Sequence, residues 1–81
     1  GRRLQEIALG LLDLLLEARK CNESERPDLL RRADVELDRL RYTVRLCHEI
    51  DLFSLKQYRH ASGLLAEVGR LLGTWRKRYN R

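Results

Sequence analysis

Residues 27–50, PDLLRRADVELDRLRYTVRLCHEI, decide the fold of this chain. Their apolar side chains recur at alternating spacings of three and four, at Leu30, Ala33, Leu37, Leu40, Val44 and Cys47. This spacing is typical of a helix that buries one face in a bundle. Pro27 suits the first helical turn, where a backbone N–H has no partner, and Asp28 complements the positive helix start. The stretch predicts a helix over residues 27–50 with Cys47 in the core.

The segment before it predicts a helix over residues 3–20 that is apolar around most of its circumference. One stripe at helical spacing comprises Leu4, Ile7, Ala8, Leu11, Leu12, Leu15 and Ala18. Three further leucines, at 9, 14 and 16, widen that stripe. A helix this apolar is normally buried on more than one side. Residues 22–26 are polar and predict a loop.

A third helix is predicted over residues 54–78. Ser54 and Gln57, three residues apart, form a capping box, which is the most specific local signal in the chain. The apolar stripe that follows comprises Tyr58, Ala61, Leu65, Val68, Leu72, Trp75 and Tyr79. Gly69 and Gly73 lie one turn apart within the helix, where glycine costs about 1 kcal/mol relative to alanine. They either let a neighbouring backbone approach closely or are simply tolerated.

The fold class that follows is all-α, an up-down antiparallel helical bundle in a single domain over residues 1–81. A single proline among abundant Leu, Arg, Glu and Ala favours helix over strand. A chain this short buries only about 60% of its unfolded surface, and three helices would leave much of the first one in water. Residues 1–4, GRRL, lack an initiator Met and an N-cap residue. We therefore expect an upstream helix or a neighbouring subunit to cover the first helix.

Several classes of function find no support in the sequence. Cys21, Cys47, His48 and His60 reproduce no zinc-ligand spacing and offer no disulfide framework, and this cysteine usage fits a reducing, cytoplasmic location. No zinc-protease motif, glycine-rich phosphate loop or serine with a base at readable spacing is present. No apolar run could span a membrane, and no signal peptide opens the chain. We therefore expect a protein that is not an enzyme, with no cofactor, no metal and no membrane partner.

Positive charge is concentrated in the last third of the chain. The formal net charge is +5, from 17 Lys and Arg against 12 Asp and Glu. Residues 54–81 hold a single acid, Glu67, among seven basic residues, Lys56, Arg59, Arg70, Arg76, Lys77, Arg78 and Arg81. A basic stripe without matching acids is typical of a protein that binds a polyanion.

We predict a nucleic-acid or partner-binding surface at this end of the chain. Its residues are Lys56, Arg59, Arg70, Arg76, Lys77 and Arg78, with Arg41 and Arg45 of the preceding helix. The alternative is a solvated helix end whose charges stabilise the helix dipole. Trp75 and Tyr79 continue the core stripe, although they could instead stack on bases. The arginines of residues 31–45 alternate with acids and are interpreted mostly as surface ion pairs.

Three stretches also resemble a known family. They are residues 29–42 (LLRRADVELDRLRY), 46–58 (LCHEIDLFSLKQY) and 67–75 (EVGRLLGTW). They resemble the accessory variability determinant proteins of diversity-generating retroelements, and more loosely the four-helix proteins encoded in bacterial ribosomal-RNA intervening sequences. Residues 51–58 and 69–73 are the most specific part. Residues 1–4 are similar to the start of that family's second helix, so the resemblance covers nearly the whole chain and lacks the family's first helix.

The resemblance implies a four-helix bundle that assembles into a five-fold, barrel-like ring, a homopentamer, with a basic surface. It also implies association with a reverse transcriptase and with RNA or DNA during error-prone copying of a template RNA into cDNA. The expected function is a non-catalytic accessory protein that scaffolds this synthesis. Three alternatives remain: a purely structural oligomerisation module, an intervening-sequence protein without a reverse transcriptase partner, and an engineered or truncated bundle derived from the family.

Overall fold

The computed structural model describes residues 2–79, and its three helices account for most of them. The helices are α1 (Arg2–Lys20), α2 (Arg26–Glu49) and α3 (Leu55–Tyr79). Each bound lies within one residue of the bound expected from the sequence. Residues 2–79 contain no strand, so the all-α class is confirmed.

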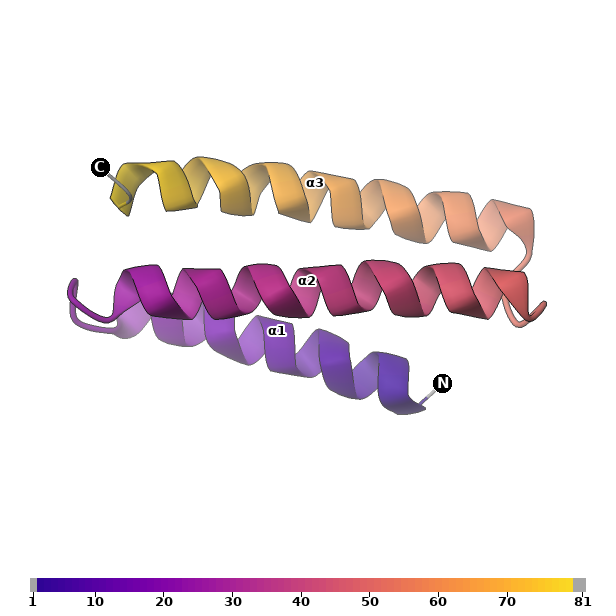
Figure 1. Ribbon diagram of the computed structural model, residues 1–81, viewed down its shortest axis with the longest axis horizontal. Coiled ribbons are helices and arrows are strands. Elements are labelled where there is room, and N and C mark those ends of the chain that lie inside the picture. The colour runs from indigo at the N-terminus through magenta and orange to yellow at the C-terminus, as the bar shows by residue number, and fades with distance from the viewer. Residues whose placement is uncertain (1, 80–81) are drawn as a thin grey trace.

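The helices form an open layer with α2 in the middle. α1 and α3 flank α2, and the chain reverses direction at each connection (Figure 1). Over residues 2–79, no Cα atom of α1 lies within 8 Å of a Cα atom of α3. The arrangement is therefore up-down and antiparallel, as expected, but α1 and α3 do not close a three-helix bundle.

The core is built around α2. All six residues of its apolar stripe are buried, including Cys47. Leu30 and Leu37 are the largest side chains that are fully buried. Burial of one leucine side chain contributes roughly 1.5–3 kcal/mol to folding. Among residues 2–79, both α1 and α3 pack against α2, so most of the core lies along it.

α1 buries a narrower face than its sequence predicts. Ile7, Leu11 and Ala18 are buried, but Ala8 and Leu12, which belong to the same stripe, are exposed. The reason is that, among residues 2–79, the backbone of α1 lies close to that of α2 and not to that of α3. Other leucines of α1 are also largely exposed, with Leu9 at 60%. The expectation that three helices leave much of the first one in water is thus confirmed.

The capping box at the start of α3 is present. The backbone N–H of Gln57 donates to Ser54 Oγ at 3.1 Å, and the backbone N–H of Ser54 donates to Gln57 Oε1 at 2.8 Å. The N–H groups at the start of a helix have no carbonyl partner within the helix, and these two side chains satisfy two of them. This reciprocal pair fixes the point at which the chain turns back along α2.

Arg26, which the sequence places in a loop, instead begins α2 and joins all three helices. Its Nε donates to the carbonyl of Ala18 at 2.8 Å, and its NH2 group donates to the carbonyl of Cys21 at 3.3 Å. These bonds satisfy carbonyls at the end of α1. The same guanidinium lies 5.0 Å from the ring centroid of Tyr79 in α3. Pro27 is consequently the second residue of α2, and Glu25 precedes the helix without a side-chain cap hydrogen bond.

Candidate nucleic-acid interface

Four of the predicted site residues share one face of α3. They are Lys56, Arg59, Arg70 and Lys77, which we call the basic face of α3. Their successive spacings of three, eleven and seven residues return to the same side of a helix. All four are exposed. The basic residues therefore form a strip along α3 and are not confined to its C-terminal end.

The remaining predicted residues of α3 lie elsewhere. Arg76 is directed at α2, where its NH1 group lies 3.2 Å from Asp34 Oδ2, and its side chain is only 29% exposed. Arg78 is exposed and is turned roughly 100° from its neighbour Lys77, but it lies only about 40° around the helix from Lys56, at the edge of the basic face. Arg81 lies outside the described residues. Arg76 thus joins α3 to α2, and Arg78 borders the basic face beside Lys56.

Trp75 and Tyr79 have structural positions. Both are partly buried and pack against the hydrophobic core, and Tyr79 also receives the guanidinium of Arg26. This agrees with the interpretation that they continue the apolar stripe. Base stacking by these two rings has no support in the structure.

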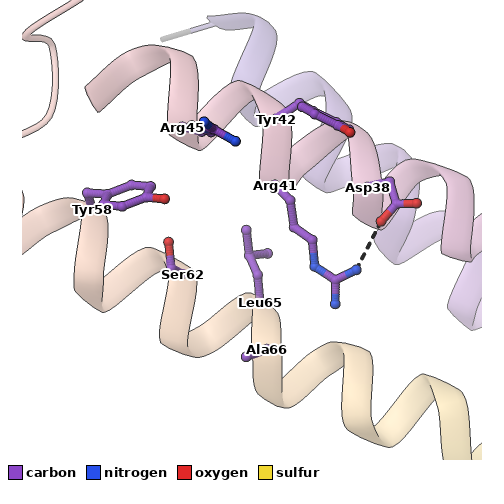
Figure 2. Close-up of a pocket in the computed structure, with 8 residues that line it drawn as sticks. All are labelled: Asp38, Arg41, Tyr42, Arg45, Tyr58, Ser62, Leu65 and Ala66. Carbon is purple, nitrogen blue, oxygen red and sulfur yellow. Dashed lines mark hydrogen bonds and ion pairs between the residues drawn. The ribbon is translucent and has the colours of Figure 1, made fainter. Parts of the chain in front are cut away.

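A cleft with both charged and apolar lining side chains runs between α2 and α3 beside the basic face, with a volume of about 440 Å³ (Figure 2). We call it the α2–α3 cleft, and its lining residues are Asp38, Arg41, Tyr42, Arg45, Tyr58, Ser62, Leu65 and Ala66. Ala66 is seven residues after Arg59 and four before Arg70, so it lies in the same row as those two residues. The two predicted arginines of α2 and the basic face of α3 therefore border one continuous region.

Arg41 crosses the cleft from α2 toward α3, as Figure 2 shows. Its NH1 group donates to Asp38 Oδ1 at 2.9 Å. Its NH2 group lies against the backbone of Gly69, where an added Cβ would clash with it. Gly69 therefore admits an arginine side chain, so neither of the two alternatives, close approach of a neighbouring backbone or simple tolerance, describes it. At Gly73 nothing lies within 4 Å of an added Cβ, so that glycine is simply tolerated.

Most arginines of α2 are engaged in ion pairs with nearby acids. Arg45 Nε lies 3.1 Å from Glu49 Oε1 in the cleft region. Arg31 and Arg39 make similar pairs within one helical turn. Exposed pairs of this kind contribute only about 0.2–1 kcal/mol each. The interpretation of these arginines as surface ion pairs is confirmed, and such weak pairs leave Arg41 and Arg45 available to a phosphate.

The single acid of α3 offsets part of the charge of the basic face. Glu67 pairs with Arg70, and the hydrogen bonds and positive charge of that guanidinium lower the pKa of Glu67. The pKa of Arg70 is raised by the same hydrogen bonds and by the carboxylate charge. Over residues 2–79, Lys56, Arg59 and Lys77 have no acidic partner within 4.0 Å. These three are the uncompensated charges of the face.

The cleft itself was not predicted, although the sequence carries a signal for it. Small residues recur along one row of α3 at spacings of four, three and four, at Ser62, Ala66, Gly69 and Gly73. A row of small side chains beside longer ones leaves space at a helix–helix contact. Tyr58 was assigned only to the apolar stripe, yet it borders the cleft and its ring stacks on His48 with centroids 4.7 Å apart.

An apolar groove lies between α1 and α3. It has a volume of about 220 Å³ and is lined by Leu15, Val68, Leu71, Leu72 and Trp75. We call it the apolar groove. Leu71 and Leu64 of α3 are more than half exposed beside it. The groove is the direct result of the missing contact between α1 and α3.

Among residues 2–79, no three His, Cys, Asp or Glu side chains cluster closely enough to hold a metal ion. No helix in this range is both long and apolar enough to cross a membrane.

Comparison with known proteins gives one match. A family model described as bAvd-like matches residues 1–79, which include all three helices, the basic face of α3 and the α2–α3 cleft. No curated protein and no solved structure matches the chain. The match thus covers every feature described above, at the level of a family.

Proposed function

Because the chain belongs to the bAvd-like family, the accessory variability determinants of diversity-generating retroelements, we propose that it binds nucleic acid and the reverse transcriptase of such an element. In this role it holds template RNA, cDNA and polymerase together during mutagenic cDNA synthesis. The family is generally non-catalytic. The copying chemistry then belongs to the polymerase, and this chain supplies a scaffold.

The observation that carries the proposal is the basic face of α3. Lys56, Arg59 and Lys77 point to solvent along about 20 residues of helix without acidic partners among residues 2–79. Uncompensated cations in a row attract phosphates and release their counterions. Arg41 and Arg45 extend the same positive region across the cleft to α2. We assign nucleic-acid contacts to these side chains and to Arg70.

Assembly is the second part of the proposal. The apolar groove and the exposed leucines of α1 leave a surface that water solvates poorly. We propose that a fourth helix completes the bundle and that several copies associate, as a homopentamer, in the cytoplasm. A ring would place one basic face per subunit around a common axis and so raise the avidity for a long polyanion.

The test is size-exclusion chromatography with light scattering on the chain alone, with a structured RNA, and with the retroelement's reverse transcriptase. Each mixture is run at low and high salt. We expect an oligomer that takes up RNA at low salt and releases it at high salt, and that also elutes with the reverse transcriptase. The matched control is a protein of the same mass without a basic face.

Three results would count against parts of the proposal. A stable oligomer without RNA affinity would favour a purely structural oligomerisation module. RNA binding without reverse transcriptase binding would favour an intervening-sequence protein that acts alone. A monomer that ignores both partners would contradict the whole proposal, although the helical fold would stand.

A further inference from the structure

The α2–α3 cleft combines an aromatic ring, two guanidinium groups and a hydroxyl group in a space of molecular size. Its volume of about 440 Å³ falls within the range of roughly 300–1,000 Å³ that is usual for small-molecule sites. A double helix cannot enter such a space, but one nucleotide of a single strand can. The cleft therefore distinguishes between forms of nucleic acid, which the exposed basic face does not.

Tyr58 provides a stacking surface at one end of the cleft. Its ring lies parallel to the imidazole of His48, with an interplanar angle of 9°. His48 is itself fixed, because Nδ1 lies 3.1 Å from the carbonyl oxygen of Phe53. One face of the Tyr58 ring is thus occupied by His48, and the ring also borders the cleft. A base that stacks there extends an existing aromatic stack on a rigid support.

Two arginines of α2, Arg41 and Arg45, border the cleft and supply positive charge for the phosphates of such a strand. Arg41 already reaches across the cleft without a ligand, where it pairs with Asp38 and contacts Gly69, and the weakness of that exposed pair leaves its guanidinium free to turn to a phosphate. Arg45 lies one helical turn further along α2 and is bound to Glu49 through Nε, at a side-chain exposure of 66%. The distance between neighbouring phosphates of a single strand is similar to the length of one turn of α2. Because Asp38 places a negative charge beside Arg41, the cleft favours a base with its flanking phosphates over a dense phosphate cluster.

Two nearby features are consistent with a single base. Ser62 directs its hydroxyl group toward the space between the helices (Figure 2), where it can donate to or accept from a base edge. Leu65 and Ala66 form an apolar wall against which the flat face of a base can lie. Beside the cleft, Arg59 and Arg70 continue the positive region along α3.

From these contacts we infer that the α2–α3 cleft binds one unstacked base of a single-stranded RNA or DNA segment, stacked on Tyr58, with the flanking phosphates at Arg41 and Arg45. The inference rests on the proposed nucleic-acid function and specifies the form of nucleic acid that the site prefers. The basic face then binds any strand by charge, and the cleft adds a preference for unpaired nucleotides.

Fluorescence anisotropy with labelled oligonucleotides tests the inference. The probes are a single-stranded RNA of about 12 nucleotides, which is within the usual range of site sizes for single-strand binding, the fully paired duplex of the same RNA, and a single labelled nucleotide. We expect the protein to bind the single strand more tightly than the duplex, and the single nucleotide weakly, because most phosphate contacts are then absent. A preference for the free nucleotide over the strand would overturn the inference in favour of a small-molecule site.

Two substitutions separate the cleft from the basic face. Tyr58→Ala should weaken single-strand binding by roughly 5-fold to 100-fold, the range that loss of one base–aromatic stack produces, and leave duplex binding unchanged. Tyr58→Phe keeps the ring and should retain affinity. Ser62→Phe fills the cleft without removing the ring or a charge, and should also weaken single-strand binding alone. The matched control, Ser24→Phe, makes the same change in the exposed connection between α1 and α2.

Tyr58 also packs in the stripe of α3, so circular dichroism should show that each variant remains folded. If Tyr58→Ala is unfolded, Ser62→Phe alone decides the outcome. Single-strand affinity that is unchanged in Ser62→Phe would overturn the inference while leaving the proposed function intact. If the wild-type protein binds neither the single strand nor the duplex at low salt, the proposed function is wrong, and the inference falls with it.

Discussion

At the scale of single residues, a few side chains determine how the helices meet. Arg26 joins the end of α1, the start of α2 and the last turn of α3 through two hydrogen bonds and one ring contact. Gly69 leaves room for the guanidinium of Arg41 in the cleft. Neither role is visible in the sequence, because both depend on which residues tertiary packing brings together.

We predict that Arg26→Ala lowers the free energy of unfolding by about 1–3 kcal/mol, since charge-assisted hydrogen bonds to partly buried carbonyls would be lost. Arg26→Lys should not restore the stability, because an ammonium group cannot present the planar fork that contacts both carbonyls. Urea denaturation at a fixed protein concentration measures the effect. The control is Arg32→Ala, at an exposed arginine of the same helix, and an equal loss there would contradict the role of Arg26.

A second residue-scale prediction concerns the glycines of α3. Gly63→Ala should stabilise the protein by about 0.5–1 kcal/mol, because the site is open and alanine favours helix. Gly69→Ala should gain less, since the Arg41 guanidinium must move away, and it should weaken RNA binding where Gly63→Ala does not. Urea denaturation and anisotropy compare the two variants. Equal gains in stability with equal RNA affinity would show that the contact between Arg41 and Gly69 has no consequence.

At the scale of the elements, each helix start has its own chemistry. α3 begins with a reciprocal capping box, whereas α2 begins after Glu25, whose side chain makes no cap hydrogen bond and whose φ and ψ are −89° and −21°. α2 compensates with Pro27 and Asp28 in its first turn. The two starts should therefore respond differently to the loss of the side chain at the cap.

Ser54→Ala should destabilise the protein by about 0.5–2 kcal/mol, the usual effect of removing an N-cap hydrogen bond. Glu25→Ala, the matched change at the start of α2, should alter stability by less than about 0.5 kcal/mol. Thermal denaturation followed by circular dichroism distinguishes the two. A larger loss in Glu25→Ala than in Ser54→Ala would contradict the assignment of the caps.

Much of the element-level structure could be predicted from the sequence, because local signals decide it. The spacing of Leu30 through Cys47 predicted the buried face of α2, and Ser54 with Gln57 predicted the start of α3. The exposure of Leu12 could not be predicted in the same way, since an apolar stripe does not reveal how many neighbours a helix has. The cleft was likewise missed, because Ser62 and Ala66 become a cavity wall only where α2 lies opposite them.

At the scale of the whole molecule, the open layer explains both of its surfaces. α1 and α3 flank α2 without meeting, so one side presents the apolar groove. On α3, Ser62 and Ala66 line the cleft, whereas Leu71 and Trp75 line the groove, and these pairs lie on opposite edges of the helix stripe. A further helix or subunit could therefore cover the groove and leave the cleft and the basic face open to nucleic acid.

The most direct test of this account is the salt dependence of RNA binding by the wild type and by a variant with Lys56, Arg59, Arg70 and Lys77 all changed to Gln. Each lost phosphate contact should reduce the slope of log affinity against log salt by about 0.7 for a single strand. We predict a slope shallower by up to roughly 3, with weaker binding at low salt. A control variant removes the same charge elsewhere, at Arg3, Arg19, Lys20 and Arg32, and should keep a slope close to wild type. If both variants change the slope equally, net charge and not the basic face of α3 governs binding, and the central claim is wrong.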